Sequence, residues 1–278
     1  MMKNIARDMN QLTGVFQIKS QDLRTHSILD MCMAPGGFLA TALRINPGAQ
    51  ALGFSLPTCH GGHEVLLPDR LNVTPKLLDI TMLAADMGVA DIPSDHPDAR
   101  NFLPSQFTSK HNFDLALCDG QVLRNHERAA YRENREASRL ILAQLALGLE
   151  HIKPGGTMIV LLHKVEAPHT VQLLHIFEKF ASVRLYKPVR IHAKRSSFYM
   201  LATNIRADCE EAAMAIDRWK TLWKIATFGS DDVYRNTLLE DALDAEVLLK
   251  DFGPRLVELG RKIWDIQANA LERAPFVR

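Results

Sequence analysis

Cysteine is scarce in this chain, and the cysteines that are present lie far apart, at Cys32, Cys59, Cys118 and Cys209. No Cys-x-x-Cys pair occurs, so we predict neither a disulfide framework nor a zinc ribbon, and we expect reduced thiols. Cys59, His60 and His63 form one short cluster of metal-ligand residue types. Metal sites usually need a second, separated pair, and none is evident. We therefore predict a glycine-rich connecting loop at this cluster and no bound metal.

Long apolar runs are also missing. No run reaches the roughly 18 apolar residues of a membrane span, and the first ten residues lack the apolar core of a signal peptide. We therefore expect no membrane partner and a cytoplasmic or nuclear location. Aromatic residues make up only 7% of the chain, so the sequence does not predict a surface of stacking rings for single-stranded nucleic acid.

A strong net charge is the third absence, because the formal charge is only +1. This value is far from the basic balance that by itself indicates nucleic-acid binding. The charge is unevenly divided, however. Residues 207–278 hold 14 acidic and 10 basic side chains, and residues 1–206 hold 18 acidic and 23 basic ones. The first part of the chain therefore suits an anionic ligand better than the second.

Seven apolar runs predict strands, at 27–31, 51–55, 80–84, 113–118, 157–163, 182–186 and 198–203. Most are continuous apolar runs, as strands of a parallel sheet require when both faces are buried. Helical patterns at 38–44, 127–151 and 170–180 alternate with them, after a short helix at 2–10. This alternation predicts an α/β fold with a doubly wound, mostly parallel seven-strand sheet.

The pattern becomes wholly helical from residue 207 onward. At 278 residues the chain is long enough for one large domain with an appendage. We predict a ligand-binding domain at 1–206 and a helical extension at 207–278. The extension is expected to pack on the sheet or on a partner, and its helices are candidate homodimer contacts.

The first strand runs directly into a sharp turn, from Asp30 to "APGGF" at 34–38. Paired glycines allow the backbone to approach a ligand closely, and the helix that follows directs its first N–H groups at the same place. A dinucleotide, a phosphate or the carboxylate of S-adenosylmethionine would each suit such a turn. In a doubly wound sheet, ligands bind beyond the carboxyl ends of the strands, so we expect the loops after the strands to line one crevice.

Four stretches carry a resemblance to a known family. "DMCMAPGGF" (30–38) resembles the first motif of FtsJ-like S-adenosylmethionine-dependent methyltransferases, D-x-x-x-x-P-G-G-aromatic. "FDLALCDGQ" (113–121) and "PGGTMIVLLHK" (154–164) resemble the strands that end in the family's catalytic Asp and Lys. "KPVRIHAKRSSFYMLAT" (187–203) resembles its basic final hairpin. The resemblance covers roughly residues 1–205. It implies a Rossmann-like domain, S-adenosylmethionine as cofactor with S-adenosylhomocysteine as product, and RNA as the substrate.

The resemblance also implies a reaction, the 2′-O-methylation of ribose by a Lys-Asp-Lys-Glu tetrad. A ribose hydroxyl has a pKa far above 7, so a neutral amine nearby is a suitable base. The resemblance makes Lys164 this base and Asp119 the acid that orients it. Lys3 is preferred over Lys19 as the first lysine. Ser197 stands where the family has its glutamate, so the tetrad is incomplete.

Glu166, two residues beyond Lys164, is a candidate substitute for that missing glutamate. A plainer interpretation remains open for each of these residues. Lys164 would be a solvated lysine at a strand end, Asp119 and Gly120 an ordinary turn, and Lys3 an exposed lysine on a helix.

The cofactor residues follow from the same motifs. Ser55 takes the place of the acid that binds the cofactor ribose, and Asp86 lies where an acid approaches the adenine amino group, with Asp79 as its rival. The full set of predicted cofactor contacts is Asp30, Ala34, Pro35, Gly36, Gly37, Phe38, Ser55, Asp86 and Asp119.

Basic residues supply the predicted substrate contacts, which are Arg124, His126, Lys187, Arg190, Lys194 and Arg195. A second basic set has spacings of four, three and four, which place it on one helix face: Arg128, Arg132, Arg135 and Arg139. Glu133 and Glu136 lie within pairing distance, so an ion-paired, solvent-facing surface is predicted for this set.

The sequence offers three functions, of which we predict the first, RNA ribose 2′-O-methylation. The second is methylation of a small molecule or another non-RNA acceptor, with which the lost glutamate and the near-neutral charge are consistent. The third is a non-catalytic homologue that keeps the fold and binds the cofactor.

Overall fold

The structure is a computed structural model of residues 1–278, and it describes all of them except 20–24, 70, 124–125, 127, 242 and 275–278. One sheet forms its centre. The strands are β1 (Ser27–Asp30), β2 (Gln50–Ser55), β3 (Val73–Leu77), β4 (Phe113–Cys118), β5 (Ile152–His163), β6 (Ser182–Tyr186) and β7 (Ser197–Thr203). Their order is β3-β2-β1-β4-β5-β7-β6, and only β7 runs antiparallel to its neighbours. The predicted fold class is confirmed.

Strand order reverses between β1 and β4. The chain builds outward from β1 to β3 and then returns to place β4 on the other side of β1. Asp30, the last residue of β1, is level with Gly53 of β2 and Leu117 of β4. The carboxyl ends of these strands therefore meet at one edge, which is where open α/β sheets bind ligands.

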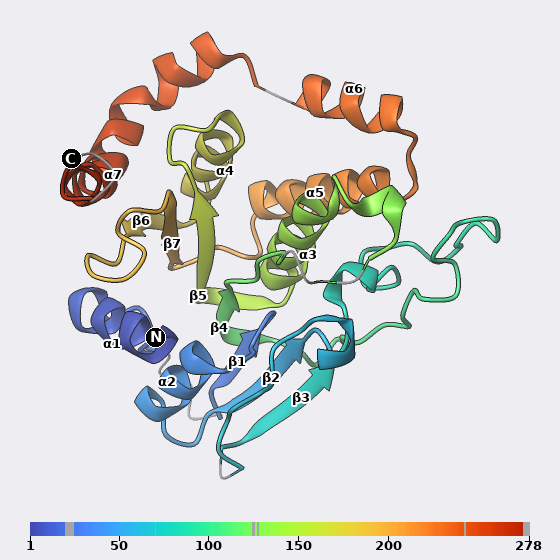
Figure 1. Cartoon of the computed structure of the whole chain (residues 1–278), viewed down its shortest axis with the longest axis horizontal. Coiled ribbons are helices and arrows are strands. Elements are labelled where there is room, and N and C mark those ends of the chain that lie inside the picture. The colour runs from blue at the N-terminus through green and yellow to red at the C-terminus, as the bar shows by residue number, and fades with distance from the viewer. Residues whose placement is uncertain (20–24, 70, 124–125, 127, 242, 275–278) are drawn as a thin grey trace.

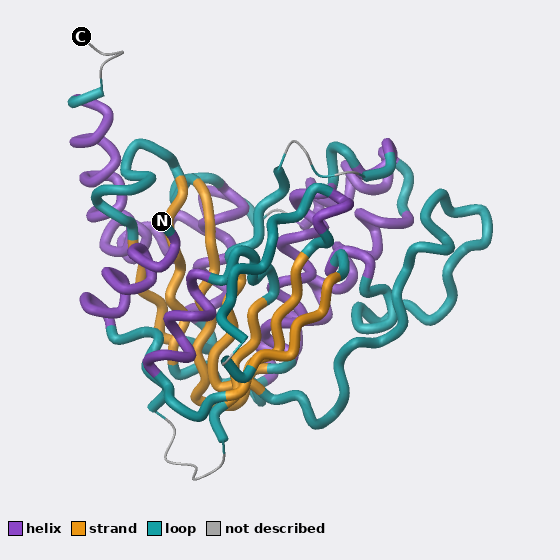
Figure 2. The backbone as a smooth tube through the Cα atoms, turned by 60° about the horizontal axis from the view of Figure 1, so that its bottom comes forward, coloured by secondary structure: helices purple, strands orange, loops and turns teal. Residues whose placement is uncertain are grey.

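Helices cover both faces of the sheet (Figures 1 and 2). The α helices are α1 (Met2–Thr13), α2 (Gly37–Ile45), α3 (Glu136–Glu150), α4 (Pro168–Glu178), α5 (Glu210–Phe228), α6 (Asp231–Asp241) and α7 (Ala245–Glu272); the short 3₁₀ helices are η1 (Thr58–His60), η2 (Ile80–Met82) and η3 (Ala130–Arg132). Side chains alternate along β4, so Leu115 and Leu117 pack under α1 and α2, and Ala116 and Cys118 pack under α3. Each face of the sheet therefore has its own hydrophobic core.

Two predicted elements are wrong. The third strand was expected at 80–84 but lies at Val73–Leu77, and 80–82 forms η2. As an edge strand β3 pairs only with β2, contains Pro75 and has no buried residue, so it lacks the continuous apolar run of a central strand. The helix expected at 127–151 begins only at Glu136, because the segment before it turns inward and buries two arginines, Arg132 and Arg135.

The C-terminal extension packs on the sheet domain. α5 lies along α3, and α7 contacts α4 and β6. Trp219 and Trp223 are buried in the same core as β4 and β5. Arg255 of α7 donates hydrogen bonds to Glu178 of α4 and to the Val183 carbonyl of β6. None of the helices among the described residues is long and apolar enough to cross a membrane.

Candidate active site

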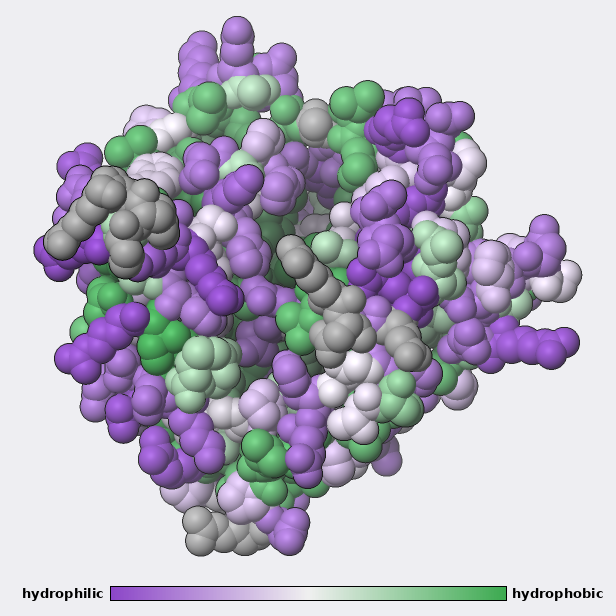
Figure 3. Space-filling model, viewed as in Figure 1, coloured by the Kyte–Doolittle hydropathy of each residue, from purple (hydrophilic) through white to green (hydrophobic). Residues whose placement is uncertain are grey.

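A small pocket lies at the carboxyl edge of the sheet. Its lining comes from the segments that follow β1, β2, β3 and β4, together with α3: Met31, Cys32, Leu56, Leu78, Asp79, Ile80, Thr81, Gln121, Val122, His126, Arg128, Glu136 and Leu140. The enclosed space is about 60 Å³, which is room for a few water molecules. The space-filling view is hollowed near its middle, with hydrophobic residues visible at depth (Figure 3). The predicted crevice is therefore present but narrow.

The double-glycine turn needs both of its glycines. Gly36 has a φ of 99°, in the left-handed region that favours glycine, and precedes the first residue of α2. A Cβ on Gly37 would lie 2.6 Å from the Met2 Cβ and 2.9 Å from the Lys3 backbone nitrogen. The turn therefore brings the start of α1 against the start of α2, and it places Lys3 beside the predicted cofactor site.

A segment from the β2–β3 connection covers this turn. The Leu66 N–H donates to the Pro35 carbonyl at 3.1 Å. The half-buried side chain of Leu67 lies so close that a Cβ on Gly36 would be 2.4 Å from it. We call residues 61–69 the cover segment. In this conformation it narrows the space over the turn.

Two carboxyl groups lie close together beneath the turn. Asp30 is buried, and its Oδ1 accepts a hydrogen bond from the Cys32 N–H at 3.1 Å. Burial, and then the charge of Asp119, raise the pKa of Asp30 well above its usual value. Burial raises the pKa of Asp119 to about 7. The pair therefore resists holding two negative charges, and a nearby cation would favour its ionised form.

A buried glutamine fixes the loop that carries Asp119. The Gln144 side-chain oxygen accepts the Gly120 N–H at 2.9 Å, and its amide donates to the Leu140 carbonyl. A Cβ on Gly120 would lie 2.3 Å from the Cys32 sulfur, so this loop also needs glycine. Gln144 is not among the predicted site residues, because nothing in an apolar helix pattern indicates which polar residue contacts a distant loop.

Lys164 follows β5, on the strand next to the one that ends before Asp119. Cys118 pairs with Val160, so both residues lie at the carboxyl edge of neighbouring strands. Lys164 is exposed and has a φ of 50°. Its N–H donates to the Ser196 carbonyl, and its carbonyl accepts from the Ala167 N–H, both at 3.0 Å. Among the described residues, no direct ion pair joins the Lys164 and Asp119 side chains.

The other predicted tetrad positions lie nearby. Ser197 begins β7, is buried, and pairs with His163 directly before Lys164. Lys3 is exposed on the first turn of α1. Glu166 accepts a hydrogen bond from the Trp264 indole at 3.1 Å, so its carboxylate is already engaged with α7.

The second and third cofactor positions differ from each other in placement. Ser55 is buried at the end of β2, next to Leu56 of the pocket. Asp86 accepts hydrogen bonds from Ser105 and from the N–H groups of 106 and 107, and it does not line the pocket. Asp79, its rival, does line the pocket and accepts from the Thr81 N–H.

The predicted substrate residues separate into three groups. Arg124 lies outside the described residues, and His126 lines the pocket, where burial lowers its pKa. Arg190, Lys194 and Arg195 are exposed on the β6–β7 loop. Lys187 was expected on the substrate surface but is buried.

The Lys187 ammonium donates to the carbonyls of Arg195 and Ser197, and burial lowers its pKa to about 8. The carbonyls of Arg195 and Ser197 point toward the buried Lys187, which supplies the hydrogen-bond donors that they need there. Lys187 therefore stabilises the conformation of the β6–β7 loop.

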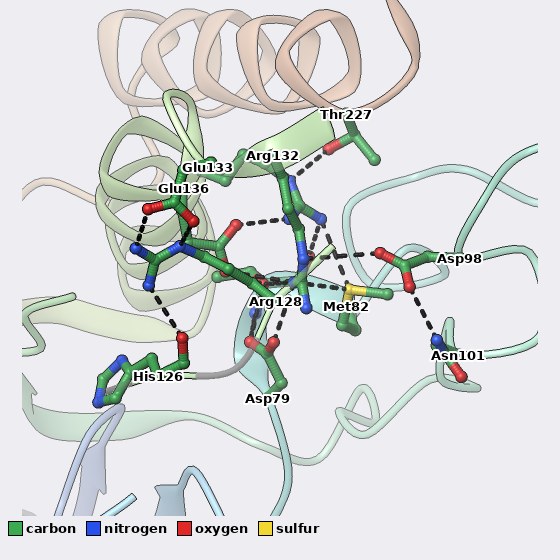
Figure 4. Close-up of polar contacts among 12 residues, drawn as sticks. Asp79, Met82, Asp98, Asn101, His126, Arg128, Arg132, Glu133, Glu136 and Thr227 are labelled. Atoms are coloured by element: carbon green, nitrogen blue, oxygen red, sulfur yellow. Dashed lines mark hydrogen bonds and ion pairs between the residues drawn. The ribbon is translucent and has the colours of Figure 1, made fainter. Parts of the chain in front are cut away.

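Arg128 of the second basic set is partly exposed and pairs with the exposed Glu133, as predicted, but the other three arginines of the set are buried, contrary to the predicted solvent-facing surface. Arg132, Arg135 and Arg139 are each at most 7% exposed. Arg132 pairs with Asp79, Asp98 and Glu136, and Arg139 pairs with Glu136 at 2.7 Å (Figure 4). The predicted pairing with Glu136 is confirmed, but its location is not. The spacing of residues in a sequence indicates which of them share a helix face, but it does not indicate whether that face is exposed to solvent or buried.

This buried network joins the pocket to the extension. Arg139 donates to the Thr227 hydroxyl of α5 and to the Thr81 carbonyl of η2. Arg135 donates to the Gly229 carbonyl and pairs with Asp231. The pocket wall and the first C-terminal helices are therefore held by the same side chains.

A model of the FtsJ-like methyltransferase family matches residues 8–205 of this sequence. The match covers well over half of the chain. The chain belongs to this family.

Solved structures with a similar fold are methyltransferases of low sequence identity. Human methyltransferase-like protein 13, in complex with S-adenosylhomocysteine, is 10% identical over 78% of this chain and 92% of its own, with a TM-score of 0.43. An rRNA methylase from Streptococcus thermophilus is 12% identical over 72% of this chain and 96% of its own, with a TM-score of 0.38.

An O-methyltransferase family protein from Burkholderia thailandensis is 13% identical over 73% of this chain, with a TM-score of 0.38, and this chain spans only 57% of its length. No curated protein matches the sequence.

This FtsJ-like protein is a methyltransferase that uses S-adenosylmethionine, the cofactor of its family. The residues of the pocket suit that cofactor chemically. Leu56, Ile80 and Val122 provide apolar walls for a purine, and Asp79 and Gln121 provide polar groups beside them. The buried, proton-retaining pair Asp30 and Asp119 suits a ligand that carries an ammonium and a sulfonium charge. The space of about 60 Å³ is smaller than the whole cofactor.

Proposed function

We propose that this protein methylates a ribose 2′-hydroxyl of RNA, with Lys164 as the base and Asp119 as the residue that orients it. The observation that carries the proposal is the placement of these two residues. They follow the adjacent parallel strands β4 and β5, at the edge of the sheet where the family's motif I turn also lies. Asp119 and Lys164, which are 45 positions apart in the sequence, thus share one edge with the cofactor turn.

The chemistry requires a group that accepts a proton. S-adenosylmethionine supplies an electrophilic methyl group on a sulfonium, and the ribose hydroxyl must lose its proton as it attacks that carbon. Lys164 is suited to accept this proton once substrate covers it, because desolvation favours the neutral amine. The backbone of Lys164 has a positive φ, a conformation that costs roughly 1–2 kcal/mol for a residue with a side chain. Backbone hydrogen bonds from its N–H and to its carbonyl hold it in this conformation.

Asp119 answers to positive charge. Burial raises its pKa to about 7, so that the carboxyl group is only partly ionised at neutral pH. A sulfonium or a lysine ammonium nearby would lower that pKa, and the carboxylate would then hold the amine in position. The same residue therefore contributes to cofactor binding and to the placement of the base.

The rest of the tetrad is assigned by position. Lys3 is the first lysine, because α1 starts directly against Gly37 of the cofactor turn. Ser197, beside the end of β5, replaces the glutamate with a hydroxyl, which forms hydrogen bonds but carries no charge. Glu166 is not proposed for that role, because the Trp264 indole already occupies it.

Charge on the β6–β7 loop favours RNA over an uncharged small molecule. Arg190, Lys194 and Arg195 are exposed beside β7, and phosphate contacts from such residues position RNA without reading its sequence. His126, and Arg124 by its place in the sequence, are proposed as further contacts.

Labelled methyl transfer tests the proposal. The wild-type protein is incubated with labelled S-adenosylmethionine and either total RNA or a metabolite extract, and labelled RNA is digested to detect nucleotides methylated at the 2′-oxygen. We expect transfer to RNA, a loss of at least 100-fold for Lys164→Ala, and an unchanged cofactor affinity by calorimetry. Lys110→Ala, an exposed lysine in the β3–β4 connection, is the matched control.

Each other outcome identifies an alternative. Transfer to the metabolite extract alone would establish a small-molecule acceptor. Cofactor binding without transfer to either pool would establish a non-catalytic binding protein. Equal loss of cofactor affinity and transfer in Lys164→Ala would make Lys164 a structural residue and would refute its role as the base.

A further inference from the structure

A second, wider hollow lies outside the cofactor pocket. It is a groove of about 700 Å³ between the β6–β7 loop and the last turns of α7. Arg190, Lys194 and Arg195 line one side, and Asn269 and Arg273 line the other. The α7 side lies beyond residue 205, where the family match ends. This groove is therefore a feature that the extension adds to the methyltransferase domain.

The groove lies next to Lys164, the candidate base. The Ser196 carbonyl, one residue after the loop arginine Arg195, accepts the N–H of Lys164 at 3.0 Å. On the other side, Trp264 of α7 donates to Glu166 at 3.1 Å. Both walls of the groove are thus connected by hydrogen bonds to the segment 164–166.

Both walls are also held in place. Lys187 ties the β6–β7 loop from inside through two carbonyls. Arg255 ties the first half of α7 to α4 and to β6, and Trp264, nearer to the groove, ties the helix to Glu166. These contacts limit the movement of both walls, which reduces the conformational entropy that a ligand must remove on binding.

The charge of the groove is one-sided. Among the described residues that line it, four are Arg or Lys, one is His192, and none is acidic. Arg190, Lys194 and Arg195 lie on the β6–β7 loop, and only Arg273 comes from the extension, which as a whole holds 14 acidic and 10 basic side chains. Concentrated positive charge in an open groove is complementary to a chain of phosphates, and it attracts one with a strong dependence on salt.

We propose that this groove binds the sugar-phosphate backbone of the RNA next to the methylated nucleotide, and that α7 supplies one of its walls. The inference rests on the proposed RNA substrate. It gives the C-terminal extension a function, because Arg273 and Asn269 hold the RNA so that a neighbouring ribose reaches the edge where Lys164 lies. The contacts are to backbone phosphates, so they position the strand and do not select its sequence.

Charge reversal at and before the end of α7 tests this inference in the full-length protein. Arg273→Glu, directly after α7, changes the groove, and Arg261→Glu makes the same charge change 12 residues earlier in the helix, at an exposed position that does not line the groove. Binding of a fluorescent 30-nucleotide poly(U) is measured by anisotropy at several salt concentrations. Transfer to total RNA and cofactor affinity are measured alongside.

We expect Arg273→Glu to weaken poly(U) binding about tenfold and to reduce the slope of log affinity against log salt by about one, as loss of one phosphate contact does. The KM for RNA should rise accordingly, and the cofactor dissociation constant should stay unchanged. Arg261→Glu should behave as wild type in every measurement. Thermal unfolding of both variants checks that they are folded.

The inference and the proposed function fail in different ways. If wild type methylates RNA but Arg273→Glu matches Arg261→Glu in affinity and salt slope, the groove does not bind RNA and the proposed activity stands. If wild type transfers methyl groups only to metabolites and does not bind poly(U), the proposed function fails and the groove inference fails with it.

Discussion

The carboxyl pair beneath the cofactor turn makes the stability of this protein depend on pH. In the folded protein Asp119 has a pKa raised from 3.8 to about 7. Such a group contributes stability that is fully present below the unfolded pKa and is lost as the pH rises through the folded pKa. Between about pH 4 and pH 8, ionisation of the Asp119 carboxyl therefore lowers the free energy of unfolding. Asp119→Asn, which keeps the shape and removes the ionisation, should abolish this loss.

The size of the effect follows from the shift. Three pKa units correspond to about 4 kcal/mol at 1.36 kcal/mol per unit. Asp119 keeps some contact with solvent and shares its protons with Asp30, so we halve this value to about 2 kcal/mol. In a protein of this size that difference shifts the unfolding midpoint by roughly 5 °C. The variant should thus be markedly more stable than wild type at pH 8 and nearly equal to it at pH 4.5, while losing methyl transfer.

Thermal and urea unfolding from pH 4.5 to 8.5 measures this difference. Asp217→Asn, at an exposed position on α5, is the control, and its curve should run parallel to that of wild type. If the curves of wild type and Asp119→Asn are also parallel over the whole range, then Asp119 ionises normally and our account of the carboxyl pair is refuted.

Two substitutions test the architecture around the site. Arg139→Met leaves the Glu136 carboxylate buried with one partner fewer and should reduce the free energy of unfolding by about 3–5 kcal/mol in urea titrations. Adding Glu136→Gln to this variant should recover part of the lost free energy. No recovery would mean that the charge of Glu136 is not the cause of the loss. Gly37→Ala places a methyl group 2.6 Å from the Met2 Cβ and should loosen α1, seen as faster proteolysis at the N-terminus and weaker cofactor binding. Gly253→Ala, whose added Cβ meets nothing within 4 Å, should leave both readouts unchanged, and equal sensitivity of the two variants would contradict the contact between α1 and the turn.

The central strands and the order of the motifs could be predicted because both leave a local signal. A strand buried on both faces is a continuous apolar run, and the glycine turn follows β1 within six residues. The edge strand β3 carries no such run, because its side chains are partly or fully exposed and Pro75 has no backbone N–H to donate. The spacing of the charged residues also predicted that Arg139 pairs with Glu136. It did not predict that Arg139 is buried, because the burial depends on α5, more than 70 residues later in the chain.

The remaining features of the site depend on contacts between distant segments. Gln144 contacts Gly120, Lys187 contacts carbonyls eight and ten residues later, and Leu67 contacts Gly36. None of these pairs has a spacing or composition that distinguishes it from other residues of the same type. They become visible only when the fold brings the segments together.

A ligand that approaches the Gly36 backbone closely would have to displace the Leu67 side chain of the cover segment. Leu67 is half-buried against Gly36, and removing such a side chain from its contacts costs about 1–2 kcal/mol. A cofactor that displaces Leu67 would lose this amount from its binding free energy, which is a factor of about 5 to 30 in affinity. Shortening Leu67 to alanine would then strengthen cofactor binding 5- to 30-fold without adding a single contact to the cofactor.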